Sequence, residues 1–177
     1  MLYYKKISSS LGEITLRSDG QFLTGLWFAN DKHYGDKDIQ DAQTAELPVF
    51  ALAEKWLAEY FAGCKPKVKV PLQFTGTDFQ KCVWKILQNI PYGCLVTYGD
   101  IACEIAAQRG LARMSAQAVG GAVGRNPLCI IIPCHRVIGA NGSLTGYGGG
   151  MWRKVRLLEI EKADMSKLTV PTKGTAL

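Results

Sequence analysis

The stretch that decides the fold is residues 97–123, TYGDIACEIAAQRGLARMSAQAVGGAV. The hydroxyl of Thr97 is a suitable helix cap, and apolar residues then recur at helical spacing toward Arg109-Gly110. Small side chains dominate residues 115–123, which predicts a second helix that a partner can approach closely. Two short helices joined by a turn predict a helix-turn-helix.

Elements on both sides of this stretch extend it to a winged helix-turn-helix. Residues 79–90 have apolar side chains at helical spacing, with Thr77 or Asp78 available as the cap. Residues 128–132, LCIII, are apolar and β-branched, which predicts a buried strand, and Asn141-Gly142 predicts a hairpin turn. This order of helices, strand and hairpin is typical of a winged helix.

The N-terminal part predicts a small sheet covered by one helix. Apolar bursts separated by turn residues predict three antiparallel strands at residues 2–7, 12–17 and 22–29. Residues 30–45 are polar and predict a loop. From Leu47, apolar side chains recur at helical spacing until Gly63, a helix stop signal. The predicted fold class is therefore α+β.

A domain boundary is predicted near residue 73. Residues 65–71 contain two prolines and alternating lysines, as a linker does. We expect a scaffold domain at residues 1–73, a functional domain at residues 74–163, and a flexible tail at residues 164–177.

The net charge of +6 is unevenly distributed along the chain. Residues 1–73 carry nine basic and nine acidic side chains, whereas residues 74–177 carry twelve and six, so the whole excess lies in the second part. The asymmetry favours a polyanion as the partner of that part. A solvated basic surface is the alternative.

The composition of the 177-residue chain indicates the compartment. No apolar run reaches the roughly 18 residues of a membrane span, and the start, MLYYKKISSS, lacks the apolar stretch of a signal peptide. We therefore expect a cytoplasmic protein whose six cysteines are free thiols. The question is which of them is reactive.

Cys134 and His135, at the end of the apolar run, are the candidate reactive pair. In an extended strand their side chains point to opposite faces, so His135 can activate Cys134 only if the chain bends or a water bridges them. Cys134 as a small buried apolar residue is the alternative. A metal site of Cys129, Cys134 and His135 is not expected, because the sequence has no second ligand cluster.

The surrounding sequence resembles the active-site signature of the O6-alkylguanine-DNA alkyltransferase family. The signature is carried by residues 132–137, IPCHRV, followed by residues 142–150, GSLTGYGGG. Residues 119–122, Asn126-Pro127 and Leu157-Leu158 match in the same order. The resemblance implies a ribonuclease H-like sheet-and-helix domain followed by a winged helix-turn-helix domain.

The resemblance also implies DNA repair by direct reversal, without a cofactor. A thiolate can attack the alkyl carbon on guanine O6 and form a stable thioether, so each molecule would act once. In the family a glutamate orients a histidine, which takes the cysteine proton through a water; these roles fall on Glu161, His135 and Cys134. Without the resemblance, Glu161 would be interpreted as a surface carboxylate. O4-methylthymine is an alternative substrate.

The resemblance implies further roles for residues that contact the guanine base. Tyr98 falls where the family has a tyrosine that protonates guanine N3, although by itself it would be interpreted as a packing residue. Asn126 matches an asparagine that ties the recognition-helix turn to the active-site segment. Tyr147, Gly148 and Gly149 match the loop that closes on the extruded base, with Gly148 replacing a small residue often found there.

The expected partner is double-stranded DNA containing O6-alkylguanine, bound by a monomer. The O6 atom of a paired guanine is inaccessible, so the nucleotide must be rotated out of the duplex. Family members insert an arginine from the recognition helix into the minor groove, but this chain has Gln117 there. Further DNA contacts are expected at Arg113, Ala118, Gly120, Gly121, Arg125 and Arg136.

Two other functions fit the sequence less well than alkyl transfer. Relatives that bind alkylated DNA without repairing it lack the motif cysteine, whereas this chain has Cys134. A Cys-His hydrolase requires an oxyanion hole and a directly adjacent base, which the sequence does not specify. Alkyl transfer is the function that the sequence favours.

Overall fold

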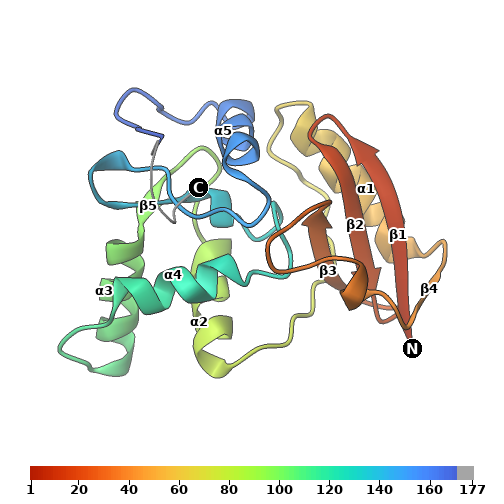
Figure 1. Ribbon diagram of the computed structural model, residues 1–177, viewed down its shortest axis with the longest axis horizontal. Coiled ribbons are helices and arrows are strands. Elements are labelled where there is room, and N and C mark those ends of the chain that lie inside the picture. The colour runs from red at the N-terminus through yellow and green to blue at the C-terminus, as the bar shows by residue number, and fades with distance from the viewer. Residues whose placement is uncertain (171–177) are drawn as a thin grey trace. The chain divides into compact units, whose positions relative to one another are not determined.

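The computed structural model describes residues 1–170 of the chain. By its internal contacts the chain divides into two compact units. One consists of Met1–Thr75 with Pro127–Cys129, and the other consists of Gly76–Asn126 with the described residues from Ile130 onward. Figure 1 shows the sheet of the first unit and the helices of the second.

The first unit is built on a four-stranded sheet. Its strands are β1 (Leu2–Ser9), β2 (Gly12–Ser18), β3 (Leu23–Phe28) and β4 (Ala42–Thr44), in the order β3-β2-β1-β4. The first three pair antiparallel, which confirms the prediction of three strands, and β4 pairs parallel to β1. The loop predicted for residues 30–45 is wrong in part, because it contains β4 and the 3₁₀ helix Asp36–Asp38. Both are too short to give a hydrophobic period.

One helix packs on this sheet, as predicted. It is α1 (Pro48–Phe61), which packs against β2 and β3. Val49, Phe50, Ala53, Leu57 and Tyr60 form its buried face. Their spacing of three and four residues is the helical period that the sequence shows.

The predicted strand at residues 128–132 is wrong. Only Leu128 makes a bridge, to Leu26 of β3, and the chain turns immediately afterwards. Ile130 has a left-handed φ of 69°, which a β-branched residue rarely adopts. Leu128, Ile130 and Ile132 are nevertheless completely buried. The apolar run therefore signals burial, and its backbone is bent where a strand would be straight.

Three capped helices open the second unit and confirm the predicted helix-turn-helix. They are α2 (Asp78–Gln88), α3 (Tyr98–Arg109) and α4 (Ala116–Gly124), and each packs on the other two. The hydroxyls of Thr77, Thr97 and Ser115 each accept a hydrogen bond from a backbone N–H three residues later. These caps fix where the helices begin.

The wing differs from the predicted hairpin. Strand β5 (Val96–Thr97) pairs in parallel with β6 (Val137–Ile138). Asn141 and Gly142 both have positive φ, as a tight Asn-Gly turn requires. The chain after this turn does not return along β6, because Ser143 forms a bridge with Thr169.

The last helix of the described chain is α5 (Met151–Ile160). The flexible tail predicted from residue 164 is wrong for residues 164–170. Met165 and Leu168 pack against a buried cluster that includes Ile138 and Leu158, and Thr169 exchanges backbone hydrogen bonds with the segment that follows β6. Residues 171–177 of the predicted tail lie outside the described residues. Among residues 1–170 no helix has the length and apolarity to cross a membrane.

Candidate active site

Cys134 lies at the start of a short 3₁₀ helix, Cys134–Arg136. The preceding Pro133 has φ −81° and ψ 66°, and the Cys134 N–H donates to the Ile132 carbonyl at 2.8 Å. The chain therefore bends here, so the two faces of an extended strand no longer separate Cys134 from His135. The residue is only 5% exposed.

His135 is completely buried and contacts the carboxylate of Glu161. Its Nε2 lies 2.6 Å from Glu161 Oε1, and neither side chain is exposed. Burial lowers the pKa of His135 below 6.5, an effect that the adjacent carboxylate opposes. The ring is therefore neutral at pH 7, and its Nε2–H donates to Glu161. Nδ1 is then the nitrogen whose lone pair can accept a proton.

The carboxylate of Glu161 is a buried anion with several donors. Arg136 donates from Nε to Oε2 at 2.8 Å and from Nη2 to Oε1 at 2.9 Å, and the Gly93 N–H donates to Oε2 at 2.9 Å. Burial alone would raise the pKa of Glu161, but the hydrogen bonds from His135 and Arg136 hold it well below 4.5. Glu161 is therefore ionised.

The structure corrects the expectation that Arg136 contacts DNA. Arg136 is 8% exposed, and its guanidinium is bound to Glu161. It also donates to the Ile90 carbonyl at 2.5 Å and lies over the ring of Tyr92. Its donors face inward, so Arg136 supports the active-site turn and cannot reach a phosphate.

Lys154 is a buried cation that sequence reasoning missed. Its Nζ donates to the carbonyl of Val137 at 2.6 Å and to the carbonyl of Thr145 at 2.8 Å. Burial lowers its pKa from 10.5 to about 8, although the negative charge of a Cys134 thiolate opposes the shift. The sequence did contain a signal, because Lys154, Leu157, Leu158 and Glu161 follow the i, i+3, i+4, i+7 spacing of one helical face.

Tyr98, the first residue of α3, shares the Thr145 carbonyl with Lys154. Its hydroxyl donates to Thr145 O at 3.1 Å. Burial, and to a lesser extent the negative charge of a Cys134 thiolate, raises the pKa of Tyr98 to about 12. The phenol is thus protonated at neutral pH and is a hydrogen-bond donor.

A pocket of about 490 Å³ lies beside Tyr98. It is lined by Thr97, Tyr98, Gly99, Ala116, Gln117, Gly120, Ala140, Thr145 and Gly146. Three of the predicted site residues, Tyr98, Gln117 and Gly120, thus share one cavity. Cys134 and the predicted loop residues Tyr147, Gly148 and Gly149 are not among its lining residues.

The outer face of α4 carries the residues expected to contact DNA. Gln117, Ala118 and Gly121 are exposed, and Gly120 is half-buried. The charged residues that flank this helix, Arg113 and Arg125, are exposed as well. The opposite face buries Val119, Ala122 and Val123 against the unit.

Two other predicted residues make hydrogen bonds that hold the backbone in place. The side-chain amide of Asn126 is buried and donates to the Ile132 carbonyl at 2.7 Å, which ties the end of α4 to the segment before Cys134. Gly149, in the loop before α5, accepts a hydrogen bond from Arg153 Nη1 at 2.6 Å.

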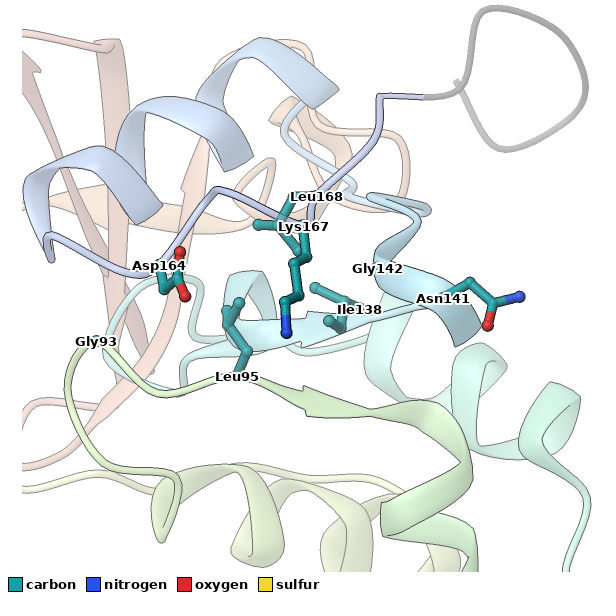
Figure 2. Close-up of a pocket in the computed structure, with 8 residues that line it drawn as sticks. All are labelled: Gly93, Leu95, Ile138, Asn141, Gly142, Asp164, Lys167 and Leu168. Carbon is teal, nitrogen blue, oxygen red and sulfur yellow. The ribbon is translucent and has the colours of Figure 1, made fainter.

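A second cavity, of about 520 Å³, contains none of the predicted site residues. Figure 2 shows its lining, with the side chain of Lys167 pointing in between Leu95 and Ile138. Gly93, whose N–H binds Glu161, lies at its edge. In residues 1–170 no cluster of three or more His, Cys, Asp or Glu side chains could hold a metal ion.

Comparison with known proteins shows matches along nearly the whole chain. Residues 2–74 match the family model of the 6-O-methylguanine DNA methyltransferase ribonuclease-like domain, and residues 78–163 match that of its DNA binding domain. A buried cysteine beside a histidine and a glutamate, on a helix-turn-helix unit, is consistent with this class of DNA alkyl-transfer proteins.

Individual relatives agree with these matches. The methylated-DNA–protein-cysteine methyltransferase of Mycobacterium tuberculosis is 45% identical over 92% of this chain and 94% of its own length. The constitutive enzyme of Bacillus subtilis is 38% identical over 92% and 96%. The crystal structure of Mycobacterium tuberculosis OGT in complex with DNA has a TM-score of 0.77 and 44% identity, covering 94% of each chain.

The chain belongs to the methylated-DNA–protein-cysteine methyltransferase family. Its activity is that of the family, the direct-reversal repair of methylated DNA. The α+β fold class predicted from the sequence, a ribonuclease-like domain followed by a DNA-binding domain, is confirmed.

The buried carboxylate of Glu161 should stabilise the folded protein. Glu161→Gln leaves the guanidinium of Arg136 buried without a counter-charge, so the free energy of unfolding should fall by about 3–5 kcal/mol. Glu159→Gln is the matched control at the end of α5, two residues before Glu161. Glu159 forms an exposed pair with Arg156, so this substitution should cost at most about 1 kcal/mol. Urea denaturation measures both. Equal losses in the two variants would show that the buried ion pair does not stabilise the site.

Proposed function

We propose that Cys134 is the residue that accepts the alkyl group, from O6-alkylguanine in double-stranded DNA. The observation that carries the proposal is the bend at Pro133, which delivers a buried cysteine next to a neutral histidine held by an ionised Glu161. A thiol needs a base to become a nucleophile, and a neutral imidazole is suited to that role.

The proposed reaction is a single displacement. His135 Nδ1 takes the thiol proton of Cys134 through a bridging water. The sulfur then attacks the alkyl carbon in line, so that a C–S bond forms while the C–O6 bond breaks. The bonding electrons pass to the guanine, and Tyr98 donates a proton to its N3. Solvent returns a proton to Tyr98 and removes one from His135, so the net products are guanine and a thioether.

The thioether also determines the number of turnovers. A carbon–sulfur bond of this kind is stable in water, and the reaction includes no step that cleaves it. Each molecule would therefore repair one lesion, and no cofactor takes part.

DNA binding is proposed for the exposed face of α4. Ala118, Gly120 and Gly121 are small enough for the helix to approach the sugar-phosphate chain closely, while Arg113 and Arg125 supply positive charge. The crystallised complex of the Mycobacterium tuberculosis relative with DNA supports this partner. A monomeric state and a cytoplasmic location remain predictions of the sequence.

The substrate pocket is proposed to form around the extruded base. Tyr147, Gly148 and Gly149 would close on the base, and the backbone N–H of Gly148 replaces the one provided by the residue often found there. Asn126 would keep the end of α4 in register with the segment before Cys134, since its amide binds the Ile132 carbonyl.

The mass of the intact protein tests the proposal. After incubation with an O6-methylguanine duplex, each molecule should gain one methyl group on Cys134 and then stop reacting. Cys134→Ser should gain none yet still bind the duplex, because α4 supplies the affinity. Multiple turnovers, or a methyl group on one of the other five cysteines, would contradict the proposal.

Gln117 provides a separate test of base rotation. If its side chain fills the space left by the rotated nucleotide, Gln117→Ala should slow repair of duplex DNA far more than reaction with free O6-benzylguanine, which needs no rotation. Gln117→Arg should tighten duplex binding and steepen its salt dependence by about one unit of log–log slope. Equal losses on duplex and free base would show that Gln117 acts on the chemistry or on folding.

A further inference from the structure

One backbone carbonyl near the active site is shared by two side chains. Thr145 O accepts a hydrogen bond from Lys154 Nζ at 2.8 Å and another from the Tyr98 hydroxyl at 3.1 Å. The ammonium of Lys154 also donates to Val137 O at 2.6 Å, so it links β6 to Thr145. A carbonyl oxygen has two lone pairs and can hold both donors at once.

The two donors have different roles in the proposed reaction. Under the proposed function, the Tyr98 hydroxyl must turn from Thr145 O to guanine N3 in order to protonate the base. A buried carbonyl left without a donor is costly, and that cost would be added to the barrier of the transfer step. Lys154 remains on Thr145 O and keeps it paired while Tyr98 turns.

A purely structural role explains Lys154 poorly. The residue is completely buried, and within the described chain its ammonium binds two backbone carbonyls and forms no salt bridge with a carboxylate. Burying an ammonium without a carboxylate partner is unfavourable. A protein with an apolar side chain of similar volume at such a position is often as stable or more stable. The charge is therefore retained at a cost to folding.

We propose that Lys154 is a positioning residue that holds the Thr145 carbonyl so that the hydroxyl of Tyr98 is free to turn to the leaving base. The inference rests on the proposed role of Tyr98 as the proton donor. Lys154 touches neither the alkyl group nor the base in this account, and acts only through Thr145 and Tyr98.

A double-mutant cycle on the transfer rate tests the inference. Lys154→Met should slow single-turnover transfer from an O6-methylguanine duplex about tenfold at saturating protein, with duplex Kd unchanged. In the Tyr98→Phe background no hydroxyl has to turn, so Lys154→Met should slow transfer by less than about twofold. Arg156→Met, an exposed cation on the same helix, is the matched control and should leave the rate unchanged. Circular dichroism checks that each variant is folded, and Lys154→Gln replaces Lys154→Met if the latter unfolds.

The outcomes separate the inference from the proposed function. If Lys154→Met slows transfer equally with and without the Tyr98 hydroxyl, Lys154 acts on the thiolate or on the fold and the inference is wrong, while alkyl transfer to Cys134 stands. If Tyr98→Phe itself reacts at the wild-type rate, the proposed role of Tyr98 fails and the inference fails with it. Cys134→Ser in parallel shows whether the measured methyl transfer is to the proposed sulfur.

Discussion

The buried carboxylate of Glu161 is the interaction on which the active site depends. It accepts hydrogen bonds from His135, from two nitrogens of Arg136 and from the Gly93 backbone. These donors come from the short helix that begins at Cys134 and from the segment after α2, while Glu161 itself caps α5. One anion thus joins three stretches that are far apart in the sequence, and it does so because none of its lone pairs can be satisfied by water.

The consequence for chemistry is a histidine with a defined proton. Because Glu161 is ionised and lies against Nε2, the neutral ring carries its hydrogen on that nitrogen. The other nitrogen is left basic, one residue from the thiol. Burial also keeps Tyr98 in its neutral, protonated form, since it disfavours the phenolate. The site therefore combines a base and an acid whose protonation states are both set by desolvation and by their partners.

The sequence predicted the elements whose signals are local. Thr77, Thr97 and Ser115 begin helices where their hydroxyls indicated, because capping involves only residues three apart. The strand expected at residues 128–132 was wrong, since a β-branched apolar run has the same composition in a buried turn, and the left-handed Ile130 cannot be read from composition. The sequence gives no signal for strand β4. It has only three residues, and backbone bonds to β1, which do not depend on side-chain type, hold it in place.

The burial of charged residues in the site was harder to predict, because their partners are distant in the sequence or are backbone carbonyls. The sequence does not reveal that Arg136 is buried, since basic residues are most often exposed and its carboxylate partner lies 25 positions away. Lys154 shares a helical face with Glu161, but a face alone does not indicate that a lysine is buried against two carbonyls. The family signature identified Cys134, His135 and Glu161 as a group, and the structure adds how burial and hydrogen bonding fix their charges.

The protonation state of His135 tests this account most directly. Nitrogen-15 NMR of the ring should show a protonated Nε2 and an unprotonated Nδ1 at pH 7. As the pH is lowered further, the ring should take up its second proton at a lower pH than an exposed histidine does, because burial lowers its pKa. A ring protonated on both nitrogens at pH 7, or a neutral ring with its hydrogen on Nδ1, would contradict the account.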